Sequence, residues 1–241
     1  MNRRIAALNR RTTSAALGDT GQSWTHFTGL LPAAKALRDL AKPKDRWLEV
    51  PYENRLERDF MVLLEADKNV AAYTPLPKPL GFKADGQFFQ AQLEFCFVRS
   101  DRSRVLAAVK SKTKLAKYDL KELYEVLTPI AWKQQAAELE VWTEAEVRRQ
   151  PRLANAEALV FQRASHPAGD KQREFTNTLG LSQALAQRGG IMSIGELREK
   201  SGLGDQAWRA ILTSIENGYL RPCKPTELLD DYALVTSGPA A

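Results

Sequence analysis

The alternation of apolar and polar positions predicts a helix near the middle of the first half of the chain. Between residues 53 and 67, apolar side chains recur at the i, i+4, i+7 and i+8 positions, which is the spacing of an amphipathic helix. They are Leu56, Phe60, Leu63 and Leu64. Such a helix places Glu53 and Glu57 on one face, because they lie four residues apart.

A hairpin is predicted next. The segment GQFFQAQLEFCFVRSD (86–101) alternates apolar and polar side chains, which predicts one half-buried strand. The segment RVLAAVKSK (104–112) predicts a second strand, and the turn residues between the two favour a hairpin. Three alternate prolines in residues 70–80 remove backbone donors, so an extended edge segment or loop is expected there.

Further helices and strands complete an α/β pattern. We expect helices at 33–41 and 115–138, the second interrupted by Pro129, a strand at 139–143, and helices at 144–150 and 155–164 that are split by Pro151. This order predicts a central mixed sheet flanked by helices, within a domain that spans residues 29–164. The segment SHPAGD (165–170) is the expected boundary before a small C-terminal domain, residues 171–241.

The C-terminal domain has the outline of a winged helix. Ser193 and Glu196 form a capping box at the start of a short helix, and a second helix is expected at 206–218. Two short strands and a loop follow, which completes the helical and winged-helix pattern. Arg209 is the one cation of the second helix, so the domain is expected either to contact DNA through it or to dock on a protein.

The net charge of +6 is located at the start of the chain. Residues 1–46 hold nine Lys or Arg and three Asp, and this difference of +6 equals the net charge of all 241 residues. We expect residues 1–28 to form a flexible basic arm on phosphate backbones, with a solvated tail as the alternative. The DNA contacts of this arm would come from Arg3, Arg4, Arg10 and Arg11.

Composition excludes several function classes. The two cysteines, Cys96 and Cys223, lie far apart and outside any CxxC pair, and the chain has only two histidines, His26 and His166, so a zinc site with the usual Cys/His spacing is not expected. The chain has neither a phosphate-binding GxxxxGK[ST] loop nor a GxGxxG motif. It also lacks an apolar run near the roughly 18 residues of a membrane span, so we expect a cytoplasmic protein without a membrane partner.

Three residues form a pattern typical of metal-dependent nucleases. Glu57 lies on the predicted helix, Glu94 within the first strand of the hairpin, and Lys110 at the end of the second. In such sites carboxylates hold a divalent cation such as Mg²⁺ beside a phosphate, and the lysine offsets the charge of the transition state. Exposed charges on a hairpin are the alternative. Lys112 and Lys114 continue the basic run and are expected to face DNA phosphates, with a solvated run of charges as the alternative.

Several sequence blocks resemble the TnsA family, the endonuclease subunit of heteromeric bacterial transposases. The resemblance covers residues 29–163, more than half the chain, and rests on five segments in family order. They are GLLPAAK (29–35), ENRLERDFMVLLEADKNVAAY (53–73), LEFCFV (93–98), LAAVK (106–110) and VWTEAEVRRQPRLANAEAL (141–159). The resemblance implies a restriction-endonuclease-like fold, DNA binding, a DDE-type transposase partner and an AAA+ ATPase regulator.

The resemblance also assigns the site residues and shows two departures from the family pattern. Glu57 occupies the position of the helix acid and Lys110 that of the lysine. Glu94 stands where the family has aspartate, and its extra methylene moves the carboxylate by about 1.5 Å. Ala108 stands two residues before the lysine, where the family has Glu or Gln, and a methyl group can neither bind Mg²⁺ nor orient a water.

These departures leave several functions open. The site is expected to be inactive, in a DNA-binding subunit that acts with the transposase. The first alternative is an active metal-dependent endonuclease, in transposition or in restriction and defence, in which Asp101 or Glu53 supplies the missing ligand. The second is a DNA-binding regulator that is not an enzyme and reuses this fold.

Overall fold

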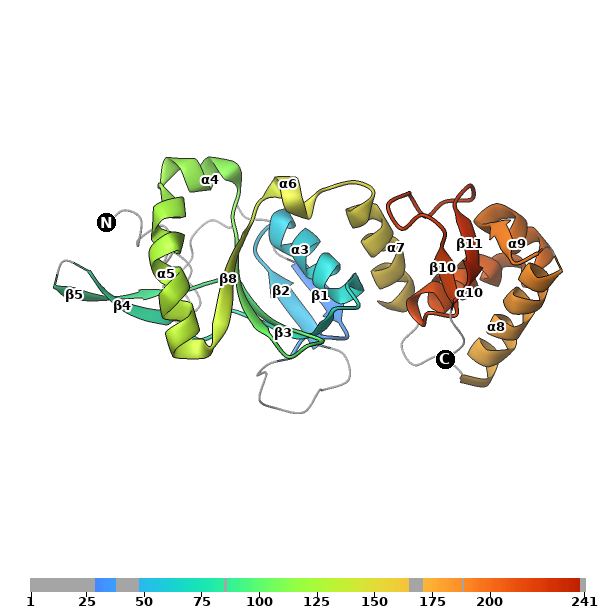
Figure 1. The fold of residues 1–241 in the computed structure, drawn as a ribbon, viewed down its shortest axis with the longest axis horizontal. Coiled ribbons are helices and arrows are strands. Elements are labelled where there is room, and N and C mark those ends of the chain that lie inside the picture. The colour runs from blue at the N-terminus through green and yellow to red at the C-terminus, as the bar shows by residue number, and fades with distance from the viewer. Residues whose placement is uncertain (1–28, 38–47, 85, 165–170, 188, 239–241) are drawn as a thin grey trace. The chain divides into compact units, whose positions relative to one another are not determined.

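A computed structural model describes residues 29–37, 48–84, 86–164, 171–187 and 189–238, which form two compact units (Figure 1). The first unit is Met1–Arg149 and the second is Gln150–Ala241. The predicted basic arm, with Arg3, Arg4, Arg10 and Arg11, lies outside the described residues. No helix in the described part of the chain combines the length and apolar character needed to cross a membrane.

A four-stranded mixed sheet forms the centre of the first unit, in the order β3, β6, β7, β8. These strands are β3 (Val70–Pro75), β6 (Phe95–Arg99), β7 (Arg104–Val109) and β8 (Ala137–Trp142). Neighbouring strands are antiparallel except β7 and β8, which are parallel. The sheet, with helices beside it, confirms the predicted α/β class, and β3 is the edge strand that the prolines predicted.

Two helices cover opposite faces of this sheet. Side chains alternate between faces along a strand. Phe60 of α3 (Arg55–Ala66) packs against the rings of Phe95 and Phe97 at centroid distances of 5.3 and 6.5 Å. Leu106 and Ala108 of β7 instead share a buried cluster with the apolar side chains of α5 (Leu120–Gln135). The predicted helix at 53–67 is confirmed, and its apolar stripe is what fixes it on the sheet.

Among the described residues, the first unit also has two small two-stranded antiparallel sheets and two short helices. β1 (Gly29–Ala33) pairs with β2 (Leu48–Tyr52), and β4 (Leu80–Ala84) pairs with β5 (Gln87–Ala91). The β4–β5 hairpin extends away from the central sheet in Figure 1. The short helices are α4 (Lys112–Lys117) and α6 (Glu144–Val147).

Three predicted elements differ from the structure. Residues 86–101 form two strands, because the chain leaves β5 at Ala91 and enters the central sheet as β6 at Phe95. The predicted helix 115–138 is divided at Asp119, whose φ of 49° is a left-handed backbone conformation that ends α4. Residues 33–37 are not helical: Ala33 ends β1 and Ala36 bridges to Tyr73 of β3.

The part of the second unit that the structure describes has four helices and a three-stranded antiparallel sheet. The helices are α7 (Arg152–Ala164), α8 (Lys171–Ala186), α9 (Ile194–Lys200) and α10 (Ala207–Glu216), with a 3₁₀ turn at Gly204–Gln206. The strands are β9 (Ile191–Ser193), β10 (Leu220–Pro222) and β11 (Leu234–Ser237), in the order β10, β11, β9. The capping box is present, since Ser193 and Glu196 exchange hydrogen bonds at the start of α9.

Helix α7 lies in the second unit, although its sequence was assigned to the first domain. It packs against α10, and the side-chain amide of Asn155 bonds the backbone of Glu227 and Leu229 at 2.8 Å each. The boundary between the two compact units therefore falls after Arg149. The boundary expected at 165–170 lies outside the described residues.

Candidate functional site

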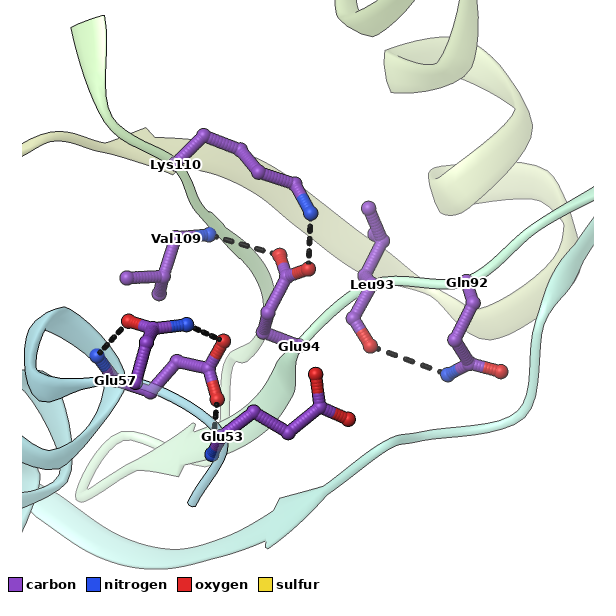
Figure 2. Close-up of polar contacts among 8 residues, drawn as sticks. Glu53, Glu57, Gln92, Leu93, Glu94, Val109 and Lys110 are labelled. Atoms are coloured by element: carbon purple, nitrogen blue, oxygen red, sulfur yellow. Dashed lines mark hydrogen bonds and ion pairs between the residues drawn. The ribbon is translucent and has the colours of Figure 1, made fainter. Parts of the chain in front are cut away.

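Glu94 and Lys110 form a buried ion pair at one end of the central sheet (Figure 2). Glu94 directly precedes β6 and Lys110 directly follows β7, and the register pairs Phe95 with Ala107. Antiparallel pairing thus brings the two side chains to one end of the sheet. Lys110 Nζ lies 2.5 Å from Glu94 Oε1, and the Val109 N–H donates to Glu94 Oε2 at 2.9 Å. Glu94 is 1% exposed.

Glu57 faces the same region from the start of α3. Asn54 is the N-cap of this helix, and its side chain accepts the Glu57 N–H at 3.1 Å. The Glu57 carboxylate accepts the Asn54 side-chain amide at 2.5 Å and the Glu53 N–H at 3.1 Å. These bonds satisfy backbone and side-chain donors at the helix N-terminus. Both oxygens of this buried carboxylate are therefore used in fixing the first turn of α3.

The structure brings Glu53 to the site but not Asp101. Glu53 precedes the N-cap of α3, so the prediction that it shares a helix face with Glu57 is wrong. Its backbone N–H bonds the Glu57 carboxylate at 3.1 Å, and Figure 2 draws it in the same close-up as Glu57 and Glu94. Asp101 lies in the turn between β6 and β7, at the far end of those strands, where it accepts the Ser103 N–H at 2.8 Å.

Ala108 lies in the hydrophobic core. Its side chain is fully buried, on the face of β7 that packs against Leu123 and Leu127 of α5. Lys110 follows two residues later, so the two positions project toward the same side of the strand. The position that would carry a ligand in a TnsA-type site is here filled by a methyl group in apolar surroundings.

Sequence reasoning missed Tyr124, whose hydroxyl is buried near Glu94. This hydroxyl has no hydrogen-bond partner among the described residues. Burial raises its pKa well above the usual value of 10.0, and the negative charge of Glu94 raises the pKa further. The spacing of Leu120, Leu123 and Leu127 could have placed Tyr124 on the buried face of α5. Nothing in the pattern indicated that a carboxylate lies close to it.

We expect Tyr124→Phe to leave the first unit as stable as the wild type or slightly more stable. Removing a buried hydroxyl that lacks a partner also removes its desolvation cost, which is about 1–3 kcal/mol. Hydrogen exchange at α5 in increasing urea would measure the change, with Tyr118→Phe on the half-buried neighbouring turn as control. A loss of more than about 1 kcal/mol would mean that the hydroxyl has a bonded partner.

The donor set fits Mg²⁺ poorly. Mg²⁺ prefers octahedral oxygen coordination, with carboxylates that are free to bind it. Here the two oxygens of Glu94 accept bonds from Val109 and Lys110, the Glu57 carboxylate is used at its helix terminus, and Ala108 supplies no oxygen. Within the described part of the chain, no group of three or more His, Cys, Asp or Glu side chains is placed to hold a metal ion.

The predicted DNA-contacting lysines lie on exposed α4. No residue of this helix is buried, and Ser111 caps it by accepting the Lys114 N–H at 3.2 Å. The Lys112 N–H donates to Glu144 at 2.9 Å, while the Lys112 side chain is exposed. Arg209 is half-buried on α10 of the second unit. The side chains of Lys112 and Lys114 are thus accessible to a DNA phosphate, whereas the half-buried side chain of Arg209 is less accessible.

The comparisons with known proteins add no family assignment. Neither the family models nor the curated proteins that were searched gave a match to this chain. The resemblance to the TnsA family therefore stays a prediction from the sequence.

Proposed function

We propose that this chain is a DNA-binding, TnsA-like subunit of a transposition complex and that its nuclease-like site does not cut DNA. One observation carries this proposal. Both oxygens of Glu94 accept bonds from within the protein, at 2.5 Å from Lys110 and 2.9 Å from Val109. The acid and lysine of a nuclease site thus persist as a buried structural ion pair.

The order of elements supports a restriction-endonuclease-like fold for the first unit. A helix with Glu57 is followed by two strands whose adjacent ends carry Glu94 and Lys110, and then by α5 and a strand parallel to β7. Figure 2 shows the Glu94–Lys110 contact, with Glu57 in the same close-up, and these are the three positions that the family resemblance selects. Function is argued from this site and not from the fold alone.

DNA binding is attributed to two basic segments. The exposed side chains of Lys112, Lys114 and Lys117 lie on α4, which follows Lys110 directly. The arginines of residues 1–28 would add sequence-independent phosphate contacts. In the second unit, Arg198 is engaged with Asp231 at 2.6 Å, which leaves Arg209 and Arg221 as modest candidates.

We assign the second unit to protein docking, with a DDE-type transposase as the partner and an AAA+ ATPase as a possible regulator of the complex. Its helix, turn, helix and hairpin order supports a winged helix. Several large apolar side chains of this unit are exposed, which is typical of interaction surfaces when they are contiguous. They are Ile191, Tyr219, Leu228, Tyr232 and Leu234.

An active endonuclease is the second candidate, and the position of Glu53 favours it. Its backbone N–H bonds the Glu57 carboxylate at 3.1 Å, so Glu53 is the acid that a rearranged site would recruit as the missing ligand. Glu53→Gln separates the two functions: cleavage lost in this variant would support the active enzyme, while unchanged DNA binding without cleavage would support the structural subunit.

The experiment for DNA binding is fluorescence anisotropy with a labelled duplex. Neutralising Lys112, Lys114 and Lys117 together should remove up to three phosphate contacts and reduce the slope of log K against log salt by about 0.9 per contact. Lys68→Ala, Lys133→Ala and Lys200→Ala, combined, match the charge change at exposed positions outside α4. A slope that is the same in both triple variants would contradict the assignment of α4 to DNA.

A further inference from the structure

The outer face of the β4–β5 hairpin combines an exposed ring with a cation. Hydrogen-bonded register places Lys83 opposite Phe88 and Gly81 opposite Gln90, so these four residues share one face. Phe88 is 63% exposed, which is unusual for a phenylalanine on a strand. The opposite face of the hairpin is apolar and joins the core through Leu80, Phe82 and Ala91. Core packing therefore does not account for Phe88.

A glycine sets the position of this ring. A Cβ added at Gly81 would lie 2.7 Å from Cζ of Phe88, so the tip of the ring rests against the backbone where a side chain would otherwise stand. The hairpin itself is anchored, because the Gln134 amide of α5 accepts the Gly81 N–H at 3.1 Å and donates to the Gly81 carbonyl at 2.5 Å. The exposed Phe88 ring thus packs on a strand whose backbone is held by hydrogen bonds to α5.

The surroundings of the ring favour a nucleic acid over a purely apolar partner. Lys83 and Gln90 flank Phe88 on the same face and are exposed, and Lys78 is exposed at the base of the hairpin. Trp132, 65% exposed, lies two residues before the anchoring Gln134. Asp85 lies outside the described residues. A lysine beside an exposed ring suits a phosphate and its base, since unpaired bases stack on aromatic side chains.

We propose that this face binds an unpaired nucleobase of single-stranded DNA, with Phe88 stacking on the base, Lys83 contacting the adjacent phosphate and Gln90 reaching the base edge. The inference rests on the proposed role in DNA transposition. It adds that the chain holds a strand which has been separated from its complement. Single strands arise next to staggered breaks, so this face suits a substrate that the complex has opened.

The test uses the full chain with single-stranded DNA that carries one 2-aminopurine, whose fluorescence is quenched on stacking. Phe88→Ala should weaken binding about 5- to 150-fold and lose the quenching, since a stacked base contributes on that scale. Phe88→Trp should retain both signals. Gly81→Ala keeps the ring but displaces it, so it should reduce quenching with little change in stability. Tyr232→Ala, an exposed aromatic of the second unit, is the matched control.

The outcomes separate this inference from the proposed function. If the chain binds duplex but not single strands, or if Phe88→Ala behaves like Tyr232→Ala, the inference is overturned while duplex binding stands. Single-strand binding without duplex binding would support the inference and contradict the α4 assignment. Tighter binding to an RNA of the same sequence would overturn the choice of DNA.

Discussion

Lys110→Met should lower the free energy of unfolding of the first unit by about 3–5 kcal/mol, because it leaves the buried Glu94 carboxylate without its counter-charge. Lys110 Nζ lies 2.5 Å from Glu94, and the two side chains are 11% and 1% exposed. The Val109 N–H would remain as the donor to Glu94 at the same site. Hydrogen exchange of the β6–β7 peptides in increasing urea reports this unit separately from the second one.

The matched variants test whether the charge pair causes this loss. Lys112→Met removes a charge from an exposed position two residues away and should change stability by less than about 0.5 kcal/mol. The double variant Glu94→Gln with Lys110→Met removes both charges, and it should recover much of the loss, because replacing a buried pair as a whole is often neutral. Equal losses in the Lys110 and Lys112 variants would contradict a buried structural pair.

Ala108→Glu should destabilise the first unit strongly in the absence of divalent cations and recover part of that loss when Mg²⁺ or Mn²⁺ is added. Ala108 is fully buried beside α5, so a larger side chain over-fills the core at about 1–3 kcal/mol, and an unpaired buried charge adds to that cost. The new carboxylate would project toward the side of β7 that carries Lys110. A cation at the restored position would offset the added charge.

Ala108→Leu controls for volume, since its side chain also over-fills the core but has no oxygen that could bind a cation. We expect it to be destabilised with no response to cations, and only the Glu variant to gain plasmid nicking. Thermal unfolding with EDTA, Mg²⁺ and Mn²⁺ measures the first effect, and agarose gels measure the second. If both variants respond equally to cations, Ala108 does not occupy a lost ligand position.

Local patterns predicted the elements that bury one regular face. The stripe from Leu56 to Leu64 predicted α3, and the capping box at Ser193 predicted the start of α9. The prediction of one strand at 86–101 was wrong because a continuous alternation does not show where a chain passes from one sheet to another. Strand β5 belongs to the β4–β5 hairpin, and β6 belongs to the central sheet. Helix α8 was missed because polar and glycine residues, Thr176 to Gly180, interrupt its apolar positions.

The site was predicted in part because sequence order brings strand ends together. Glu57, Glu94 and Lys110 were selected from the sequence, and the structure joins Glu94 to Lys110 directly. The hydrogen-bond donors to each carboxylate depend on tertiary geometry. The sequence therefore could not show that Asn54 donates to Glu57 or that Val109 donates to Glu94. Lys35 belongs to a segment that resembles the TnsA family, but it does not reach the site. Its Nζ donates to the carbonyl of Asp67 at the end of α3, at 2.5 Å.

The central claim is that this chain binds DNA and leaves it intact, because its acid and lysine bond to each other. The most direct measurement incubates supercoiled plasmid with wild-type chain and Mg²⁺ or Mn²⁺, at concentrations where anisotropy shows the DNA to be bound. We predict complete binding and no nicked or linear product. Cleavage that requires the cation and disappears in Glu57→Ala would contradict the account.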